Sequence, residues 1–170
     1  MFTKTDIEKY FTAEKSESLV FILIGMAAII LAIVFFFFLK TNFYKGIALP
    51  LALISIIQVS VGYTVYKRSD SDRKRITYAY DMNPSELKSK EIPRMEKVMK
   101  NFVVYRWVEI TLALAGLALI FLYRSNPDKT FLYGVGLGLA IQAMIMLGAD
   151  YFAEARGKIY CDGLEEFTKK

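Results

Sequence analysis

The sequence predicts an all-α integral membrane protein with four transmembrane helices, arranged as two antiparallel hairpins with helical extensions on the cytoplasmic side. Three observations predict this fold class. Apolar residues make up 55% of the 170-residue chain, and the mean hydropathy is +0.33, which exceeds the usual range of soluble domains. These residues gather in four long segments. The basic residues gather in the connections between the segments, mostly on one predicted side of the membrane.

The four apolar segments each have about the 20 residues that a helix needs to cross a hydrocarbon core. The first has no charged residue and lacks the layout of a cleavable signal peptide, so we expect it to stay as a signal anchor. The second contains Pro50, Ser55 and Gln58, which a membrane span tolerates where neighbouring helices satisfy the polar groups. The segments cover residues 19–39, 46–66, 102–123 and 131–153.

Orientation is predicted by the basic residues, because Lys and Arg are retained on the cytoplasmic side. Seventeen lie in the N-terminal segment, the long central loop and the C-terminal tail, against four in the two short loops. We therefore expect both termini inside a bacterial inner membrane. The expected parts are a cytoplasmic amphipathic helix (1–16), a first transmembrane hairpin (17–66), a basic helical loop (67–100), a second hairpin (101–153) and a cytoplasmic helical tail (154–170).

The cytoplasmic parts carry helix signals. Thr3 followed by Asp6 resembles a capping arrangement, and the apolar residues after it recur at helical spacing, as in a short helix along the membrane surface. Asn83 with Pro84 predicts another helix start, and Pro93 predicts a further start that leads into the third span. The tail is expected to extend the fourth span. Its predicted apolar stripe consists of Ile159, Tyr160, Leu164 and Phe167.

The two halves of the chain have similar layouts. Each has a lead-in, a span, a short outer turn, a second span that contains a glutamine (Gln58 or Gln142) and a basic exit. A parallel tandem repeat would produce this layout, and so would two unrelated hairpins. Small residues in the fourth span predict close helix packing, with a partner in the same chain preferred over one in another copy. These residues are Gly134, Gly136, Gly138 and Ala140.

Ionisable residues interrupt the third and fourth spans near their cytoplasmic ends. Arg106 and Glu109 share a helix face, and hairpin geometry places Asp150 about one turn nearer the cytoplasm than Arg106, with Glu154 another turn below, so that the charges can meet. A charge within a span is costly and is therefore a functional hypothesis by default. These residues are shallow, so we prefer a salt-bridge network that sets helix register over a role in ion passage or partner binding. Gln58 and Gln142 are the polar groups nearest to mid-membrane.

A basic run directly follows the second span: Lys67, Arg68, Arg73, Lys74 and Arg75. We interpret it as a topology determinant that contacts anionic lipid headgroups, at about 1 kcal/mol per basic residue near the surface. Nucleic-acid binding is not expected, because Asp70 and Asp72 interrupt the run and no binding fold is recognisable.

Catalytic chemistry has little support in the sequence. The chain has no histidine, no Gly-rich phosphate loop and a single cysteine, Cys161, so we expect no enzyme, no metal site and no cofactor.

Two functions from different classes remain. The first is a non-catalytic membrane protein that presents a cytoplasmic helical platform for binding or regulating a partner protein, with a toxin-neutralising or assembly role as examples. The second is a homo-oligomeric channel or small transporter with a charged cytoplasmic mouth at Arg106, Glu109 and Asp150. Four spans are few for a complete pathway, so the second function requires self-association.

Overall fold

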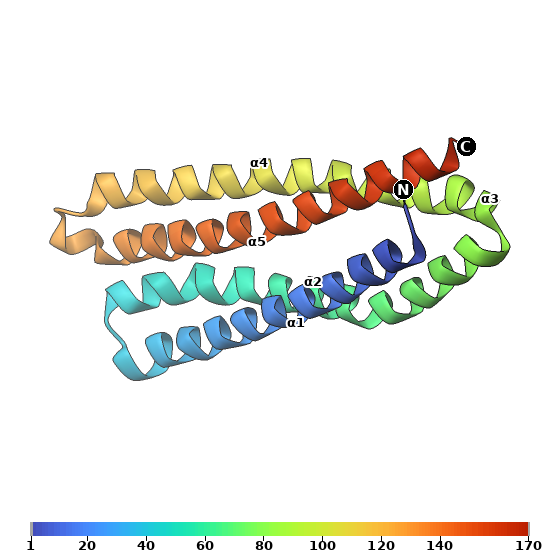
Figure 1. Ribbon diagram of the computed structural model, residues 1–170. Helices are drawn as coiled ribbons and strands as arrows, with labels where there is room; N and C mark the ends of the chain where they lie inside the picture. Colours follow the sequence, from blue (N-terminus) through green and yellow to red (C-terminus); the bar gives the residue numbers. More distant parts are fainter. Residues whose placement is uncertain (1, 170) are drawn as a thin grey trace. The chain divides into compact units, whose positions relative to one another are not determined.

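The architecture is entirely helical over the part of the chain that the computed structural model describes, residues 2–169. This confirms the all-α prediction, since no strand occurs between these residues. In order along the chain (Figure 1), the elements are α1 (Lys4–Ile33), the π-helical η1 (Val34–Leu39), α2 (Asn42–Met82), α3 (Pro84–Glu86), the π-helical η2 (Leu87–Glu91), α4 (Ile92–Tyr123), the 3₁₀ turn η3 (Pro127–Lys129) and α5 (Thr130–Thr168).

Four helical stretches are long and apolar enough to cross a membrane. They cover residues 4–39, 42–82, 84–123 and 127–168, with 36 to 42 residues each. Each stretch is well beyond the roughly 20 residues that a span requires. The residues of each helix that lie outside its apolar segment include most of the charged residues of the chain. This agrees with helices that continue beyond their apolar segments.

Local capping begins α1 as the sequence predicts. The Thr3 backbone N–H donates to the Asp6 carboxylate at 2.8 Å, and the Thr3 hydroxyl donates to the same oxygen at 2.7 Å. Asn83 precedes α3 with Pro84 in its first turn, where the missing proline N–H costs nothing. At the far end of η1, Lys40 adopts a left-handed conformation with φ 57° and ends the helix.

The predicted second helix start at Pro93 lies within one residue of the start of α4 at Ile92. Helical structure continues from Pro84 to Tyr123, and Pro93 lies in the first turn of α4. The π-helical turn η2 directly precedes it. Proline has no backbone N–H and cannot donate the i to i−4 hydrogen bond of an α-helix. The wider π-helical turn accommodates Pro93 without ending the helix.

The predicted separate helix along the membrane surface is also replaced by a continuous one. Residues 4–33 form the single helix α1. Its early apolar residues Ile7, Tyr10 and Phe11 are at most 6% exposed, because they pack against other helices of the protein. An apolar stripe does not distinguish a lipid surface from a protein partner.

The chain forms two compact units. Unit 1 comprises Met1–Val20, Gly62–Tyr105 and Asp150–Lys170, and unit 2 comprises Phe21–Val61 and Arg106–Ala149. Each of the four long helices therefore contributes one part to unit 1 and another to unit 2.

Unit 1 has a core of large side chains. The rings of Tyr10 and Tyr160 stack with centroids 4.1 Å apart, and Phe2 meets Tyr160 edge-on at 5.7 Å. Aliphatic residues from all parts of the unit complete this core, among them Ile7, Ile76, Leu87, Met95 and Leu164. In the predicted tail stripe, Tyr160 and Leu164 are buried, but Ile159 is 75% exposed and does not belong to it.

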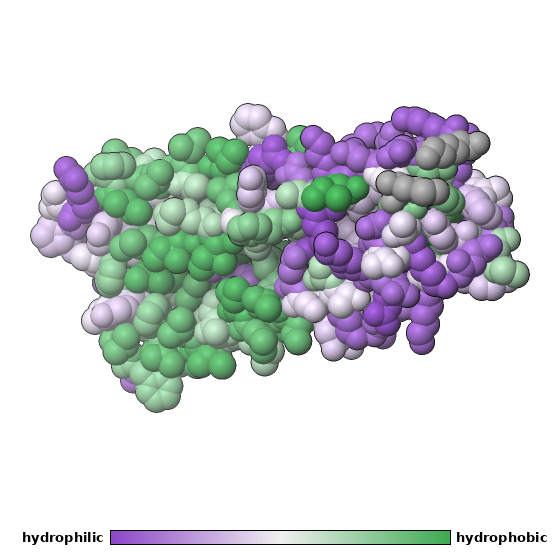
Figure 2. All heavy atoms as spheres, in the orientation of Figure 1, coloured by the Kyte–Doolittle hydropathy of each residue, from purple (hydrophilic) through white to green (hydrophobic). Residues whose placement is uncertain are grey.

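Unit 2 is packed through small residues. Ala28 and Ala32 of α1 pack with Ala48 and Leu51 of α2 in one buried cluster. Between α2 and α5 the backbones approach so closely that a Cβ on Gly46 would collide with the Phe131 carbonyl oxygen. The large apolar side chains of unit 2 lie mostly on its outside, where hydrophobic residues dominate the surface (Figure 2).

Candidate functional site

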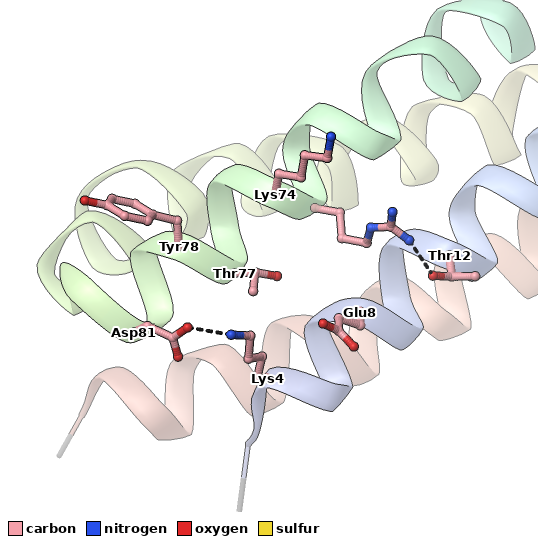
Figure 3. A pocket seen from close by; sticks show the side chains of 8 residues that line it. Lys4, Glu8, Thr12, Lys74, Thr77, Tyr78 and Asp81 are labelled. Atoms are coloured by element: carbon pink, nitrogen blue, oxygen red, sulfur yellow. Dashed lines mark hydrogen bonds and ion pairs between the residues drawn. The ribbon is translucent and has the colours of Figure 1, made fainter.

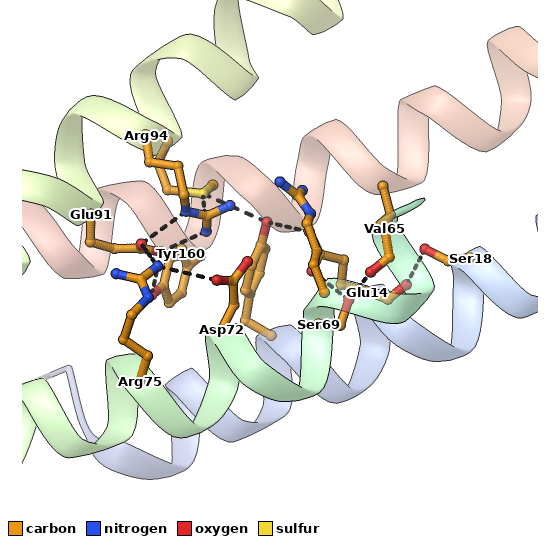
Figure 4. A network of polar contacts seen from close by, with 12 residues as sticks. Glu14, Ser18, Val65, Ser69, Asp72, Arg75, Glu91, Arg94 and Tyr160 are labelled. Atoms are coloured by element: carbon orange, nitrogen blue, oxygen red, sulfur yellow. Dashed lines mark hydrogen bonds and ion pairs between the residues drawn. The ribbon is translucent and has the colours of Figure 1, made fainter. Parts of the chain in front are cut away.

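Glu91 is the centre of a buried ionic network in unit 1. Its side chain is fully buried and accepts two hydrogen bonds from Arg94, at 2.6 Å and 2.9 Å (Figure 4). The Tyr160 hydroxyl donates to it at 3.1 Å, and an Arg75 guanidinium nitrogen lies 3.6 Å away. Glu91 is the last residue of the π-helical turn η2. The carboxylate therefore links residues from α2, α4 and α5.

A second buried carboxylate, Glu14, links α1 to α2. It is 6% exposed and accepts a hydrogen bond from the Ser69 hydroxyl at 2.8 Å. Arg68 lies 3.5 Å from the other carboxylate oxygen, to which the Tyr10 hydroxyl also donates at 3.5 Å. Buried charges of this kind require partners, because an unpaired one costs several kcal/mol.

Three groups that contact the buried carboxylates, Tyr10, Arg94 and Tyr160, have raised pKa values. Burial raises the pKa of Tyr10 and of Tyr160, so both hydroxyls stay protonated and act as donors. Burial lowers the pKa of Arg94, but the hydrogen bonds to Glu91 together with the charge of Glu91 and smaller contributions from Tyr10 and Glu14 raise it overall. The network is thus a clamp between helices, and none of these shifts moves a group toward neutral pH.

The Cys161 thiol lacks the environment of a reactive nucleophile. Cys161 is half-buried, and burial raises its pKa to about 11. A thiol with a raised pKa is mostly protonated at neutral pH and reacts slowly. Among residues 2–169, no three His, Cys, Asp or Glu side chains are grouped so that they could hold a metal ion.

A polar groove lies between α1 and α2 on the surface of unit 1 (Figure 3). Lys4, Glu8 and Thr12 line it from α1, while the wall from α2 includes Arg73, Lys74, Thr77, Tyr78 and Asp81. Lys4 and Asp81 bridge the groove with an ion pair of 2.5 Å. Arg73 donates to the Thr12 hydroxyl across it at 3.3 Å. We call this feature the α1–α2 groove.

Unit 2 contains a buried polar cluster around two glutamines. Gln142 of α5 donates to the Gln58 side-chain oxygen at 2.8 Å and lies 3.3 Å from the Ser55 hydroxyl. Gln58 in turn donates to the Phe21 carbonyl oxygen at 2.9 Å. Both glutamines are at most 1% exposed. The structure thus brings together the two mid-membrane residues singled out from the sequence.

The small residues predicted to pack are all buried in unit 2. Gly134 and Gly138 face α2, where a Cβ on Gly138 would lie 2.8 Å from the Ile47 carbonyl oxygen. Gly136 faces α4, where a Cβ would lie 2.7 Å from the Gly116 carbonyl oxygen. Ala140 is 5% exposed at the same α4 contact. α5 therefore uses alternate faces of its glycine stretch for two neighbouring helices.

The predicted charged cluster is divided between the two units. Arg106 and Glu109 belong to unit 2, where Arg106 is exposed and Glu109 is 2% exposed. Asp150 and Glu154 belong to unit 1 and are half-buried. A structural or functional role for these four residues stays a prediction.

The basic run lies on one continuous helix, α2, and its arginines pair with carboxylates of unit 1. Arg68 pairs with Glu14, Arg73 with Asp70, and Arg75 with Asp72 and Glu91. Lys67 and Lys74 are exposed. Contact of the run with lipid headgroups stays a prediction, but part of its charge is used inside the protein.

Sequence reasoning missed both buried glutamates. Each continues an apolar stripe at helical spacing: Glu14 follows Ile7 and Phe11, and Glu91 lies between Leu87 and Met95. A charged residue in register with buried apolar neighbours is a usable signal for a buried ion pair. Most glutamates are solvated, so neither residue stood out in the sequence.

Comparison with known proteins supplies no family or relative. No protein-family model, curated protein or solved structure matches the chain.

Proposed function

We propose that the chain is a multi-pass protein of a bacterial inner membrane whose unit 1 is a cytoplasmic platform that binds or regulates a partner protein, without catalysis. In this proposal unit 2 spans the bilayer as two antiparallel hairpins. Both termini and unit 1 are cytoplasmic, in accord with the distribution of Lys and Arg. Lys67 and Arg68, directly after the second span, are the residues placed to contact anionic headgroups.

The contacts within unit 2 support the hairpin arrangement. The Phe21 carbonyl contacts Gln58, and the Phe35 ring contacts the Tyr44 ring. The helical stretch formed by α1 and η1 therefore runs antiparallel to α2. Burial also repeats with a spacing of 84 residues, the spacing between the bonded Gln58 and Gln142. Buried positions 7, 11, 25 and 32 of the first half correspond to buried positions 91, 95, 109 and 116 of the second. This periodicity supports a parallel tandem repeat.

The observation that carries the platform function is the buried clamp of unit 1. Segments that only connect spans need no core, yet here Glu14 and Glu91 join residues from all four long helices around an aromatic core. Burying these charged groups has a desolvation cost, which only well-placed ion pairs and hydrogen bonds offset. A rigid helical body of this kind is suited to present a surface to another protein.

The channel alternative needs polar groups that face a pathway. In unit 2 the Gln142 amide nitrogen donates to Gln58 and Ser55, and the Gln58 amide nitrogen donates to the Phe21 carbonyl, while the Gln142 side-chain oxygen is buried without a hydrogen-bond partner among the described residues. Interhelical bonds of this kind are the usual role of glutamine in a span. The cluster therefore favours a packed bundle over a constriction that conducts.

Subunit counting in nanodiscs by native mass spectrometry, combined with ion flux in liposomes, tests the proposal against the channel. We expect a monomer or dimer without flux. A closed ring of four or more subunits with flux would overturn the platform function.

A matched pair of variants tests the platform itself. Glu91→Ala should disrupt unit 1 and abolish capture of any protein that copurifies with the wild type from native membranes, while leaving insertion intact. Glu96→Gln changes an exposed carboxylate of the same helix and should retain capture. Equal capture by both variants would contradict the proposal.

A further inference from the structure

The α1–α2 groove is the open polar surface of unit 1 that the clamp does not use. Its lining has three cations, Lys4, Arg73 and Lys74, against two carboxylates, Glu8 and Asp81. Lys4 is engaged with Asp81, whose hydrogen bond raises the pKa of Lys4 and keeps it charged. The lining therefore has one more cation than carboxylates; Arg73 also pairs with Asp70 at 3.4 Å, and Lys74 is exposed.

An unpaired hydroxyl group lies in the wall of the groove. The Thr77 side-chain oxygen is buried and has no hydrogen-bond partner among the described residues. Thr77 lies on α2 opposite Glu8 and Lys4 of α1 (Figure 3). Buried polar atoms are rarely left unpaired, because a buried group without a hydrogen-bond partner has a desolvation cost. A bound group that reaches Thr77 would remove this cost.

Exposed apolar side chains mark the same face. Large apolar residues of unit 1 are exposed chiefly near the ends that continue into unit 2. Away from those ends, the exposed ones among the described residues are Tyr78, Met82 and Ile159, at 65%, 69% and 75%. Tyr78 lines the groove and Met82 follows it by one helical turn on α2. Tyr and Met are enriched at protein interfaces.

Most of the groove lies beyond the layer of lipid headgroups if the apolar segments span the bilayer. Lys74 comes 8 residues after Tyr66, and Asp81 comes 15 residues after it, which corresponds to about 12 Å and about 22 Å along a helix. The polar layer of a bilayer extends only about 5–8 Å beyond the hydrocarbon core. A soluble protein segment is the occupant that this position favours.

We propose that the α1–α2 groove binds an acidic peptide segment of a partner protein, with carboxylates at Lys74 and Arg73, a polar group at Thr77 and an apolar side chain against Tyr78 and Met82. This inference rests on the proposed platform function and names its binding surface. The clamp residues hold α1 and α2 at the spacing that forms the groove.

Fluorescence anisotropy tests the proposal with the full-length protein in phosphatidylcholine nanodiscs. The probe is a short labelled peptide with glutamate and leucine at helical spacing, compared with its lysine counterpart. We expect the acidic peptide to bind and the lysine peptide not to bind. The affinity of the acidic peptide should fall as the salt concentration rises. Lys74→Glu should weaken binding about 10-fold. Thr77→Val should weaken it about 5-fold while unfolding no more easily than the wild type, because it removes an unpaired buried hydroxyl.

The controls separate the groove from the platform. Lys158→Glu makes the same charge change on α5 beside the exposed Ile159 and should leave peptide affinity within about twofold, as distant surface charges contribute little. Equal loss in Lys74→Glu and Lys158→Glu would overturn the groove as the site, yet leave the platform function standing. No binding of the acidic peptide to the wild type would also overturn the groove. A pore-forming ring would instead remove the platform function on which it rests.

Discussion

Units 1 and 2 are built from the same four long helices but are held together by different means. Unit 1 buries rings, long aliphatic side chains and two paired glutamates. Unit 2 brings backbones together at Gly46, Gly116 and Gly134 and buries alanines, while most of its large apolar residues lie outside. In water, burying large apolar groups drives packing. In lipid that gain vanishes, and close contact between small residues replaces it. The contrast is what a change of solvent along each helix would produce.

The largest expected effect comes from breaking the clamp of unit 1. Glu91→Ala leaves Arg94 without its carboxylate partner in a buried site, and we expect a loss of about 3–5 kcal/mol in the stability of unit 1. Hydrogen exchange measured by mass spectrometry should then rise in residues 62–105 and much less in residues 21–61. The matched variant Glu96→Gln should change neither. Uniform loss of protection across both units would contradict independent packing.

A glycine pair tests backbone contact in unit 2. Gly46→Ala places a Cβ against the Phe131 carbonyl oxygen and should cost about 1–3 kcal/mol through overpacking. Gly148→Ala, on α5, has no heavy atom within 4 Å of the added Cβ, so it should be neutral or stabilise the helix by up to about 1 kcal/mol. Thermal unfolding in detergent measures both. Similar melting temperatures for the two variants would refute packing by close backbone approach.

The glutamine pair should contribute less. In a double-mutant cycle with Gln58→Leu and Gln142→Leu, we expect a coupling energy of about 0.6 kcal/mol, typical of interhelical hydrogen bonds in membranes. Steric trapping or equilibrium unfolding in mixed micelles measures it. Coupling near zero would mean that the 2.8 Å contact between the two side chains adds nothing to the packing of unit 2.

The smallest expected effect is a dependence of stability on pH. The hydrogen bond from Lys15 and the nearby Arg73 hold the pKa of Asp70 below its ordinary value. A lowered pKa stabilises the folded state above the ordinary pKa of an aspartate, and this contribution is lost as pH falls below about 4. The melting temperature of Asp70→Asn should therefore lie slightly below that of the wild type at neutral pH and converge with it in acid. A difference in melting temperature between the two proteins that stays constant down to strongly acidic pH would contradict the lowered pKa of Asp70.

Much of the secondary structure followed from local signals. The Thr3 and Asp6 cap, the start at Asn83 and Pro84, and four helices with the length and apolarity of spans were all predictable, because caps and apolar runs depend on residues close together in the chain. The start at Pro93 agrees to within one residue with the start of α4 at Ile92, and the π-helical turn that precedes it was not predicted. The N-terminal helix was predicted to lie along a lipid surface, but its apolar stripe packs into the core of unit 1.

The sequence by itself determined that this protein has four long apolar helices and an uneven distribution of basic charge, because both properties belong to short stretches of chain. Only the tertiary structure decided which polar residues are buried together. Glu91 meets Tyr160 across 69 residues, Glu14 meets Ser69 across 55, and Gln58 meets Gln142 across 84. Such pairs depend on which helices become neighbours and in what register, and no local pattern encodes that choice.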